Sequence, residues 1–184
     1  MFDPFPRGPV LALSRRKLLI ACRLAVVVVL GLAALRAGLF TVYRVAGTSM
    51  LDTLFDGDRI LVADQPWLVH PVRPGDTVVF EIQDEVLVKR VVGAPGDRIA
   101  LLAGSVVRNG HRLVEEIPFE YSTHDTMHEV ELGLGEYFVL GDHRAVSVDS
   151  RDFGPIGEAQ ILGRVVLRMS GAGISTVAAL DRAR

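Results

Sequence analysis

An apolar segment near the N-terminus constrains the fold of this chain more than any other feature. It covers residues 18–42, about 25 positions, whereas about 20 apolar residues suffice to cross the hydrocarbon core of a bilayer. Its centre, residues 24–35, carries no charge, and Arg23 and Arg36 lie near enough to its ends for their side chains to reach the headgroups. The sequence therefore predicts a membrane anchor at residues 18–42.

Basic residues before the anchor predict its orientation. Arg7, Arg15, Arg16 and Lys17 precede the span, and such residues stay in the cytoplasm. We therefore expect a single-pass protein of the cell membrane, with a basic cytoplasmic N-terminus at residues 1–17 and everything after the span outside. A cleaved secretory signal remains an alternative, although Arg36 makes a poor cleavage site.

Charge and cysteine content limit the function of the part beyond the anchor. Six Lys/Arg and one Asp lie in residues 1–43, so this part carries +5, and the net charge of −2 leaves −7 for the rest. An acidic domain is a poor partner for nucleic acid. The only cysteine, Cys22, lies inside the predicted anchor, so no disulfide framework is expected.

Short apolar segments separated by turn signals indicate a mainly β fold beyond the anchor. Asn109-Gly110 is a strong signal for a two-residue hairpin, and Pro95-Gly96 marks another turn. Because no linker divides residues 43–169, we expect one β-domain of coiled or closed sheets, followed by a weakly helical or disordered tail at residues 170–184. The predicted strands are 59–63, 76–82, 86–92, 97–102, 105–108, 112–114, 136–140 and 160–168.

A serine and a lysine beyond the anchor suggest nucleophilic catalysis. A serine hydroxyl is a weak nucleophile until a base takes its proton, and a lysine does so only when burial keeps its amine neutral. On its predicted strand, Lys89 points to the same side as Leu87 and Val91. A polar segment at residues 141–154 adds hydroxyls and both signs of charge. Ser49 and Lys89 are therefore a candidate nucleophile and base.

Five segments, in this order and spacing, resemble the sequence boxes of bacterial type I signal peptidases, also called leader peptidases, of serine protease family S26. Together they lie between Tyr43 and about Val166, at residues 47–54, 57–62, 75–80, 89–97 and 141–154. Members of this family are membrane-anchored Ser-Lys proteases that remove signal peptides from exported preproteins. The resemblance thus implies an endopeptidase on the extracytoplasmic face, with signal peptides and the lipid bilayer as partners. It implies no cofactor and leaves the oligomeric state open.

The resemblance also implies roles for the polar residues around the dyad. Ser147 is similar to the serine that hydrogen-bonds the lysine, and Asp149 and Arg151 to a structural ion pair beside the site. The acids of this segment should point away from Lys89, because a nearby carboxylate would keep the amine charged. The backbone N–H of Ser49 would stabilise the oxyanion, with a second donor at Gly47 or at its neighbour Thr48.

Residues in the same boxes are candidate walls of small apolar substrate pockets, although each is equally compatible with the β-core. They are Tyr43, Val45, Met50, Leu54, Ile60, Val79 and Val88. Three positions depart from the family pattern: Asp52 and His143 replace a usual proline and asparagine, and Val146 replaces an asparagine. They leave open whether the chain is a main processing enzyme or a specialised paralogue.

The histidines and the overall organisation offer alternatives to the Ser49–Lys89 dyad. His124 and His128 have a metal-like spacing, but no partner cysteine or helical pattern accompanies them, so no metal is expected. His143 beside Asp142 suggests a Ser-His-Asp triad, yet Lys89 already supplies a base. Two other functions remain open: a catalytically inactive membrane-tethered β-domain, and a self-cleaving Ser-Lys protein.

Overall fold

Residues 15–64, 71–113 and 126–176 are described in the computed structural model. The chain divides into two compact units, residues 1–38 and 39–184. Helix α1 (Arg15–Arg36) forms the first unit, and its leucines, alanines and basic residues are good helix formers. The helix is followed by a last-turn bond from Ala37 N to Ala33 O (2.8 Å) and by Gly38 in the left-handed conformation (φ +66°).

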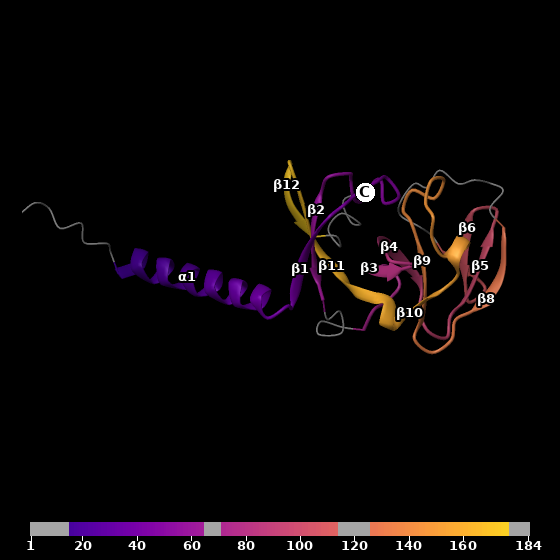
Figure 1. The fold of residues 1–184 in the computed structure, drawn as a ribbon, viewed down its shortest axis with the longest axis horizontal. Helices are drawn as coiled ribbons and strands as arrows, with labels where there is room; N and C mark the ends of the chain where they lie inside the picture. The colour runs from indigo at the N-terminus through magenta and orange to yellow at the C-terminus, as the bar shows by residue number, and fades with distance from the viewer. Residues whose placement is uncertain (1–14, 65–70, 114–125, 177–184) are drawn as a thin grey trace, which may run out of the picture. The chain divides into compact units, whose positions relative to one another are not determined.

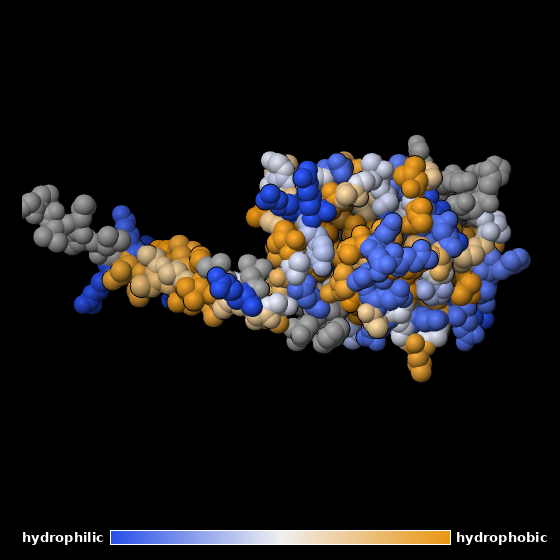
Figure 2. All heavy atoms as spheres, viewed as in Figure 1, coloured by the Kyte–Doolittle hydropathy of each residue, from blue (hydrophilic) through white to orange (hydrophobic). Residues whose placement is uncertain are grey.

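The apolar side chains of α1 are exposed along most of its length (Figure 2), for example Val27 at 66% and Leu30 at 64%. Within the described ranges, no helix combines the length and the apolar character needed to cross a membrane. The predicted span of residues 18–42 is wrong at its end, because the helix stops before Gly38 and residues 40–42 belong to a strand. Its role as an anchor stays a prediction.

All described strands lie in the second unit, in two antiparallel sheets (Figure 1). The larger sheet has eight strands, in the order β1-β2-β11-β3-β4-β9-β10, with β12 paired to β11; the smaller has the order β7-β6-β5-β8. The bounds of the strands are β1 Phe40–Arg44, β2 Arg59–Ala63, β3 Thr77–Ile82, β4 Glu85–Gly93, β5 Arg98–Leu102, β6 Ser105–Arg108, β7 His111–Arg112, β8 Met127–Glu131, β9 Glu136–Leu140, β10 Ile156–Gly157, β11 Ile161–Ser170 and β12 Gly173–Thr176. Two short helices, α2 (Ser150–Phe153) and η2 (Glu158–Gln160), lie between β9 and β11.

Three hydrophobic clusters hold the second unit together. One joins Val45, just after β1, to Ile60 on β2 and Val79 on β3, and a second packs around Phe80 and Val139 on β3 and β9. The third contains residues of both sheets: Val92, Phe138 and Leu140 from the larger, and Ile99, Leu101 and Val106 from the smaller. This third cluster is where the two sheets pack on each other.

The predicted mainly β fold is confirmed, its sheets are antiparallel, and β2, β6 and β9 have the predicted bounds. Of the predicted alternatives, coiled or closed sheets, the closed one is not met among the described strands, since the larger sheet runs as an open series from β1 to β10. The prediction of a helical or disordered tail is wrong for Gly173–Thr176, which forms β12 on the edge of β11. Residues 177–184 and the end of the predicted strand 112–114 lie outside the described residues.

Gly163 on β11 lies too close to β2 to tolerate a side chain. A Cβ there would lie 2.5 Å from the carbonyl oxygen of Ala63 and 2.5 Å from a methyl carbon of Val62. We expect Gly163→Ala to lower the free energy of unfolding by about 1–3 kcal/mol, because a packed core resists extra volume. Gly171→Ala is the matched control, since nothing lies within 4 Å of its Cβ position. Urea unfolding measures both; equal midpoints for the two variants would contradict this account.

Candidate active site

The loop between β1 and β2 carries Ser49 in a series of tight turns. Leu51 N donates to Thr48 O (3.1 Å), and Leu54 N donates to Met50 O (2.8 Å). Met50 and Leu54 are almost fully buried in the first hydrophobic cluster. These two side chains fix the loop to the hydrophobic core, and Ser49 itself is half-buried.

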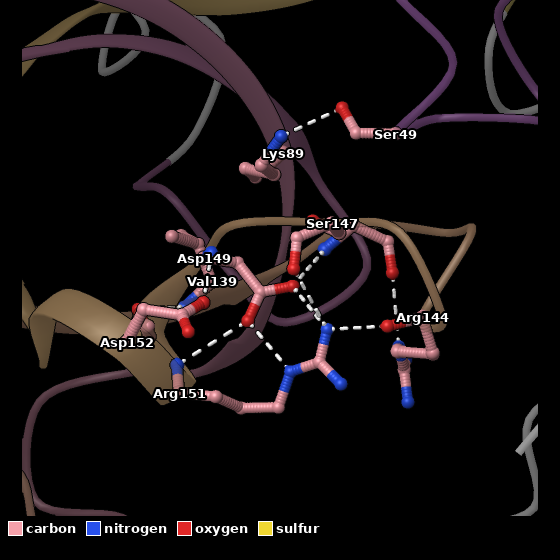
Figure 3. A network of polar contacts seen from close by, with 10 residues as sticks. Ser49, Lys89, Val139, Arg144, Ser147, Asp149, Arg151 and Asp152 are labelled. Carbon is pink, nitrogen blue, oxygen red and sulfur yellow. Dashed lines mark hydrogen bonds and ion pairs between the residues drawn. The ribbon is translucent and has the colours of Figure 1, made fainter. Parts of the chain in front are cut away.

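Lys89 lies on β4 and reaches Ser49 from another part of the sheet. Its Nζ is 2.7 Å from the Oγ of Ser49 (Figure 3), although the two residues are 40 positions apart in sequence. Lys89 is only 3% exposed, and its neighbours at two residues' distance, Leu87 and Val91, both pack in the second hydrophobic cluster. The structure thus brings the predicted nucleophile and base within hydrogen-bond distance.

The surroundings of Lys89 change the ionisation of its amine. Burial lowers the pKa of Lys89 from its ordinary value of 10.5, since an ammonium loses hydration away from water. The carboxylates of Asp149 and Asp142 act in the opposite direction and raise this pKa, while the guanidinium of Arg151 lowers it. The two acids thus oppose the effect of burial on this pKa, and the expectation that they point away from the amine stays a prediction.

Both carboxylates are instead engaged by arginines. Asp149, fully buried, accepts from Arg151 Nε (2.8 Å) and Arg151 Nη2 (3.0 Å), and also from the backbone N–H of Gly141 (2.9 Å). Asp142 accepts from Arg90 Nε (2.7 Å) and Nη2 (2.8 Å). Such bidentate pairs are among the strongest charge-assisted hydrogen bonds. The positive charge of each arginine therefore offsets much of the negative charge of its carboxylate. The Arg90–Asp142 pair was missed from the sequence.

The segment at residues 141–154 packs directly on the loop that carries Ser49, residues 45–58, here called the nucleophile loop. His143 N donates to the carbonyl oxygen of Ser49 (3.0 Å). A Cβ on Gly141 would lie 2.6 Å from that same oxygen and 2.5 Å from the Cβ of Ser147, so no larger residue fits there. Asp149 also caps helix α2 by accepting from Arg151 N. The loop and this segment therefore form one packed unit.

Ser147 does not make the bond that was predicted for it. Its Oγ is buried and has no hydrogen-bond partner within the described part of the chain. Figure 3 shows Ser147 between the dyad and the Asp149–Arg151 pair. Lys89 Nζ bonds to Ser49 Oγ, and the predicted bond to Ser147 is absent in the described part of the chain.

The predicted oxyanion donors differ in their availability. Among the described residues, the backbone N–H of Ser49 has no hydrogen-bond partner. In contrast, the N–H of Gly47 already donates to Asp56 Oδ1 (2.9 Å). Gly47 has no side chain to offer in its place, and its assignment as a second donor stays a prediction.

A cavity of about 110 Å³ opens beside the dyad. Met50 and Leu54 do not line it, because their side chains point into the core beneath the loop. Val86 and Leu87 line it but were missed, although their position on the strand that carries Lys89 could have indicated them. The lining residues are Tyr43, Arg44, Val45, Ala46, Ser49, Ile60, Val79, Val86, Leu87, Val88 and Lys89, which include five of the seven predicted wall residues.

The histidine alternatives find no support in the geometry. Nδ1 of His143 is buried without a partner in the described part of the chain, and Asp142 is paired with Arg90, so the triad interpretation is wrong. His128 belongs to the described residues, and no cluster of three potential metal ligands occurs among them. His124 lies outside them.

Comparisons with known proteins show which family this chain belongs to. The model of the family described as signal peptidase, peptidase S26, matches residues 16–170. Signal peptidase I of Bacillus caldolyticus is 37% identical over 150 residues, which are 74% of this chain and 82% of that protein. Signal peptidase I V of Bacillus subtilis (strain 168) is 34% identical over 138 residues, 67% of this chain and 82% of that protein.

A solved structure is also similar. The crystal structure of a signal peptidase I from Enterococcus faecalis V583 matches with a TM-score of 0.45 at 24% identity, covering 50% of this chain and 95% of that one. The family match alone extends over most of the sequence. The chain belongs to the signal peptidase family, peptidase S26.

The lowered pKa of Lys89 should be visible in the stability of the protein. The unfolded chain charges this amine up to pH 10.5, whereas the folded state releases the proton at a lower pH. Between these two values the unfolded state binds more protons, so the stability relative to Lys89→Met should rise with pH. Urea unfolding of both proteins at several pH values measures this. A difference that does not change with pH would mean that the folded amine titrates like a free lysine.

Proposed function

We propose that this chain is a serine endopeptidase that removes signal peptides from exported preproteins, with Ser49 as nucleophile and Lys89 as general base. One observation carries the assignment of roles: a buried amine with a lowered pKa lies 2.7 Å from a serine hydroxyl. In its neutral form, this amine accepts the hydroxyl proton at that distance. Family membership supports the reaction class.

The reaction follows from the position of each group. Ser49 Oγ attacks the carbonyl carbon of the scissile peptide bond while Lys89 takes its proton. The negative oxygen that forms accepts from the free N–H of Ser49. Lys89 then returns the proton to the leaving amine, which departs with the mature protein. A water, activated by the same amine, hydrolyses the acyl-enzyme and frees Ser49.

The cavity supports a preference for small residues next to the cleaved bond. Its walls include Ile60, Val79 and Val88, which are held in place by the hydrophobic core. Forcing a larger side chain against such walls costs about 1–3 kcal/mol. Alanine fits without this cost, so we expect short apolar side chains at this position of the substrate.

The edge of β4 offers a place for an extended peptide. Residues 85–90 of β4 pair with β3 from Ile82 to Thr77, but among the described strands β9 pairs with β4 only from Arg90 onward. The backbone between Glu85 and Lys89 is thus left open on one side, where the cavity lies. A substrate strand can bind there by backbone hydrogen bonds.

Two substitutions test the dyad. Ser49→Ala and Lys89→Met should each reduce cleavage of a preprotein by about 10³-fold or more, because nucleophile and base act as one unit. The double variant should be no slower than either single one. Gel analysis of preprotein processing measures this, and circular dichroism checks the fold. A single variant that still cleaves at the normal rate would show that the dyad is misassigned; an intact protein that never cleaves would favour the inactive paralogue.

We also propose that α1 attaches the catalytic unit to the cell membrane, with residues 1–17 in the cytoplasm and residues 43–169 outside. The exposed apolar side chains of α1 and the basic residues at its start, Arg15, Arg16 and Lys17, support this. An attached enzyme would meet its substrates where they leave the membrane.

Acidic substitutions in α1 test the attachment. Val27→Asp combined with Leu30→Asp should release the protein from membranes, since each aspartate at a helix centre disfavours insertion by about 2.5–3.5 kcal/mol. Leu134→Asp, at an exposed apolar residue of the catalytic unit, is the control. Flotation of the expressed proteins with vesicles measures the difference. Continued flotation of the double variant would contradict the proposal.

A further inference from the structure

The base of the nucleophile loop is held by backbone and ionic contacts. Val45 N donates to Asp58 O (2.8 Å), and Gly57 N donates to Val45 O (3.0 Å), which closes residues 45–58 into a loop. The carboxylate of Asp58 accepts from Arg168 Nε on β11 (2.6 Å) and from Phe55 N (2.9 Å). The end of the loop that leads into β2 is therefore fixed to the sheet.

Asp56 links this fixed end to the approach to the nucleophile. Its Oδ1 accepts from the N–H of Gly47 (2.9 Å), nine residues earlier. Gly47 has a φ of +91° and lies two residues before Ser49. The exposed carboxylate of Asp56 thus connects the fixed end of the loop to the segment just before Ser49.

The direction of the Ser49 N–H depends on this segment. Ser49 is held through its Oγ by Lys89 and through its carbonyl oxygen by His143 N. The peptide plane that precedes Ser49 is restrained at its carbonyl oxygen, since Leu51 N donates to Thr48 O (3.1 Å). The chain enters this plane through Gly47, and glycine has more backbone freedom than any other residue, so the bond to Asp56 restrains the plane from its N-terminal side.

We propose that Asp56 is a positioning residue, which holds Gly47 so that the N–H of Ser49 points to where the oxyanion forms. The inference rests on the proposed function and explains what the Gly47 N–H does instead of binding the oxyanion itself. Asp56 acts only through the loop and touches no reacting atom.

A positioning role has a particular kinetic signature. The oxyanion exists in the transition state and not in the bound substrate, so a misdirected N–H lowers kcat and leaves KM unchanged. A residue that only stabilised the fold would lower the melting temperature without this selective effect. The bond needs an acceptor oxygen and not a charge, so an asparagine amide can replace the carboxylate.

The test compares Asp56→Ala with Asp56→Asn in the full chain in detergent, with a fluorogenic peptide as substrate. We expect Asp56→Ala to lower kcat by about 10- to 100-fold with KM within about twofold, since small displacements of an oxyanion donor are costly. Binding of a peptide boronic acid, which forms a tetrahedral adduct on serine, should weaken by the same factor. Asp56→Asn should restore kcat to within about threefold of the unmodified protein, because its amide oxygen accepts the same bond.

Glu136→Ala is the matched control, because Glu136 Oε2 holds the N–H of Gly133 (2.8 Å) in the same manner away from the dyad. It should leave kcat and boronate binding unchanged. Because Asp56 is exposed, its substitution should leave the melting temperature close to that of this control. If Asp56→Ala nevertheless unfolds, Asp56→Asn compared with the isosteric Asp56→Leu makes the same comparison.

Three results would overturn the inference: an unchanged kcat in Asp56→Ala, an equal loss in Asp56→Asn, or a loss that appears in KM alone. Its failure is distinct from failure of the proposed function. If Ser49→Ala is inactive while Asp56→Ala is normal, only the positioning role is wrong. If Ser49→Ala still cleaves, the nucleophile itself is misassigned and the positioning role is wrong with it.

Discussion

The buried amine of Lys89 is the constraint on which the rest of this site depends. A lysine serves as a base at ordinary pH only where desolvation outweighs any nearby negative charge. Here desolvation is the largest influence and lowers the pKa, while Asp142 and Asp149 oppose it. Arg90 and Arg151 pair with these carboxylates and so reduce the rise that they cause in the pKa of Lys89. The arginines therefore limit the effect of these acids on the pKa of Lys89.

The same pairs also assemble the site from distant parts of the chain. Arg90 follows Lys89 on β4 and reaches Asp142 as well as Thr53 on the nucleophile loop (3.3 Å). Arg151 binds the carbonyl oxygens of Arg144 (2.7 Å) and Ser147 (3.2 Å) and thereby closes the segment that packs on Ser49. Breaking one partner of a buried pair leaves an uncompensated charge, so these contacts specify one arrangement of the loops.

Sequence reasoning succeeded where local pattern decides the outcome. β-branched strands between glycine turns gave β2, β6 and β9 with their bounds, and the motifs brought Ser49 and Lys89 into one hypothesis. It failed where tertiary contacts decide. β8 was missed because Met127–Glu131 is mostly polar and becomes a strand only by pairing with β5. Likewise, no local pattern shows that Asp56 occupies the N–H of Gly47, or that Met50 points into the core.

The one-sided pairing of β4 has a further consequence for the behaviour of the free enzyme. Unpaired backbone N–H and C=O groups on a strand edge can pair with another molecule and so promote aggregation. Among the described strands, this unpaired edge of β4 is short, because β9 pairs with β4 from Arg90 onward. It begins at Glu85, whose exposed charge disfavours pairing with a strand of another molecule. The short opening proposed for a substrate strand therefore also limits association between copies of the protein, and the charge of Glu85 adds to this limit.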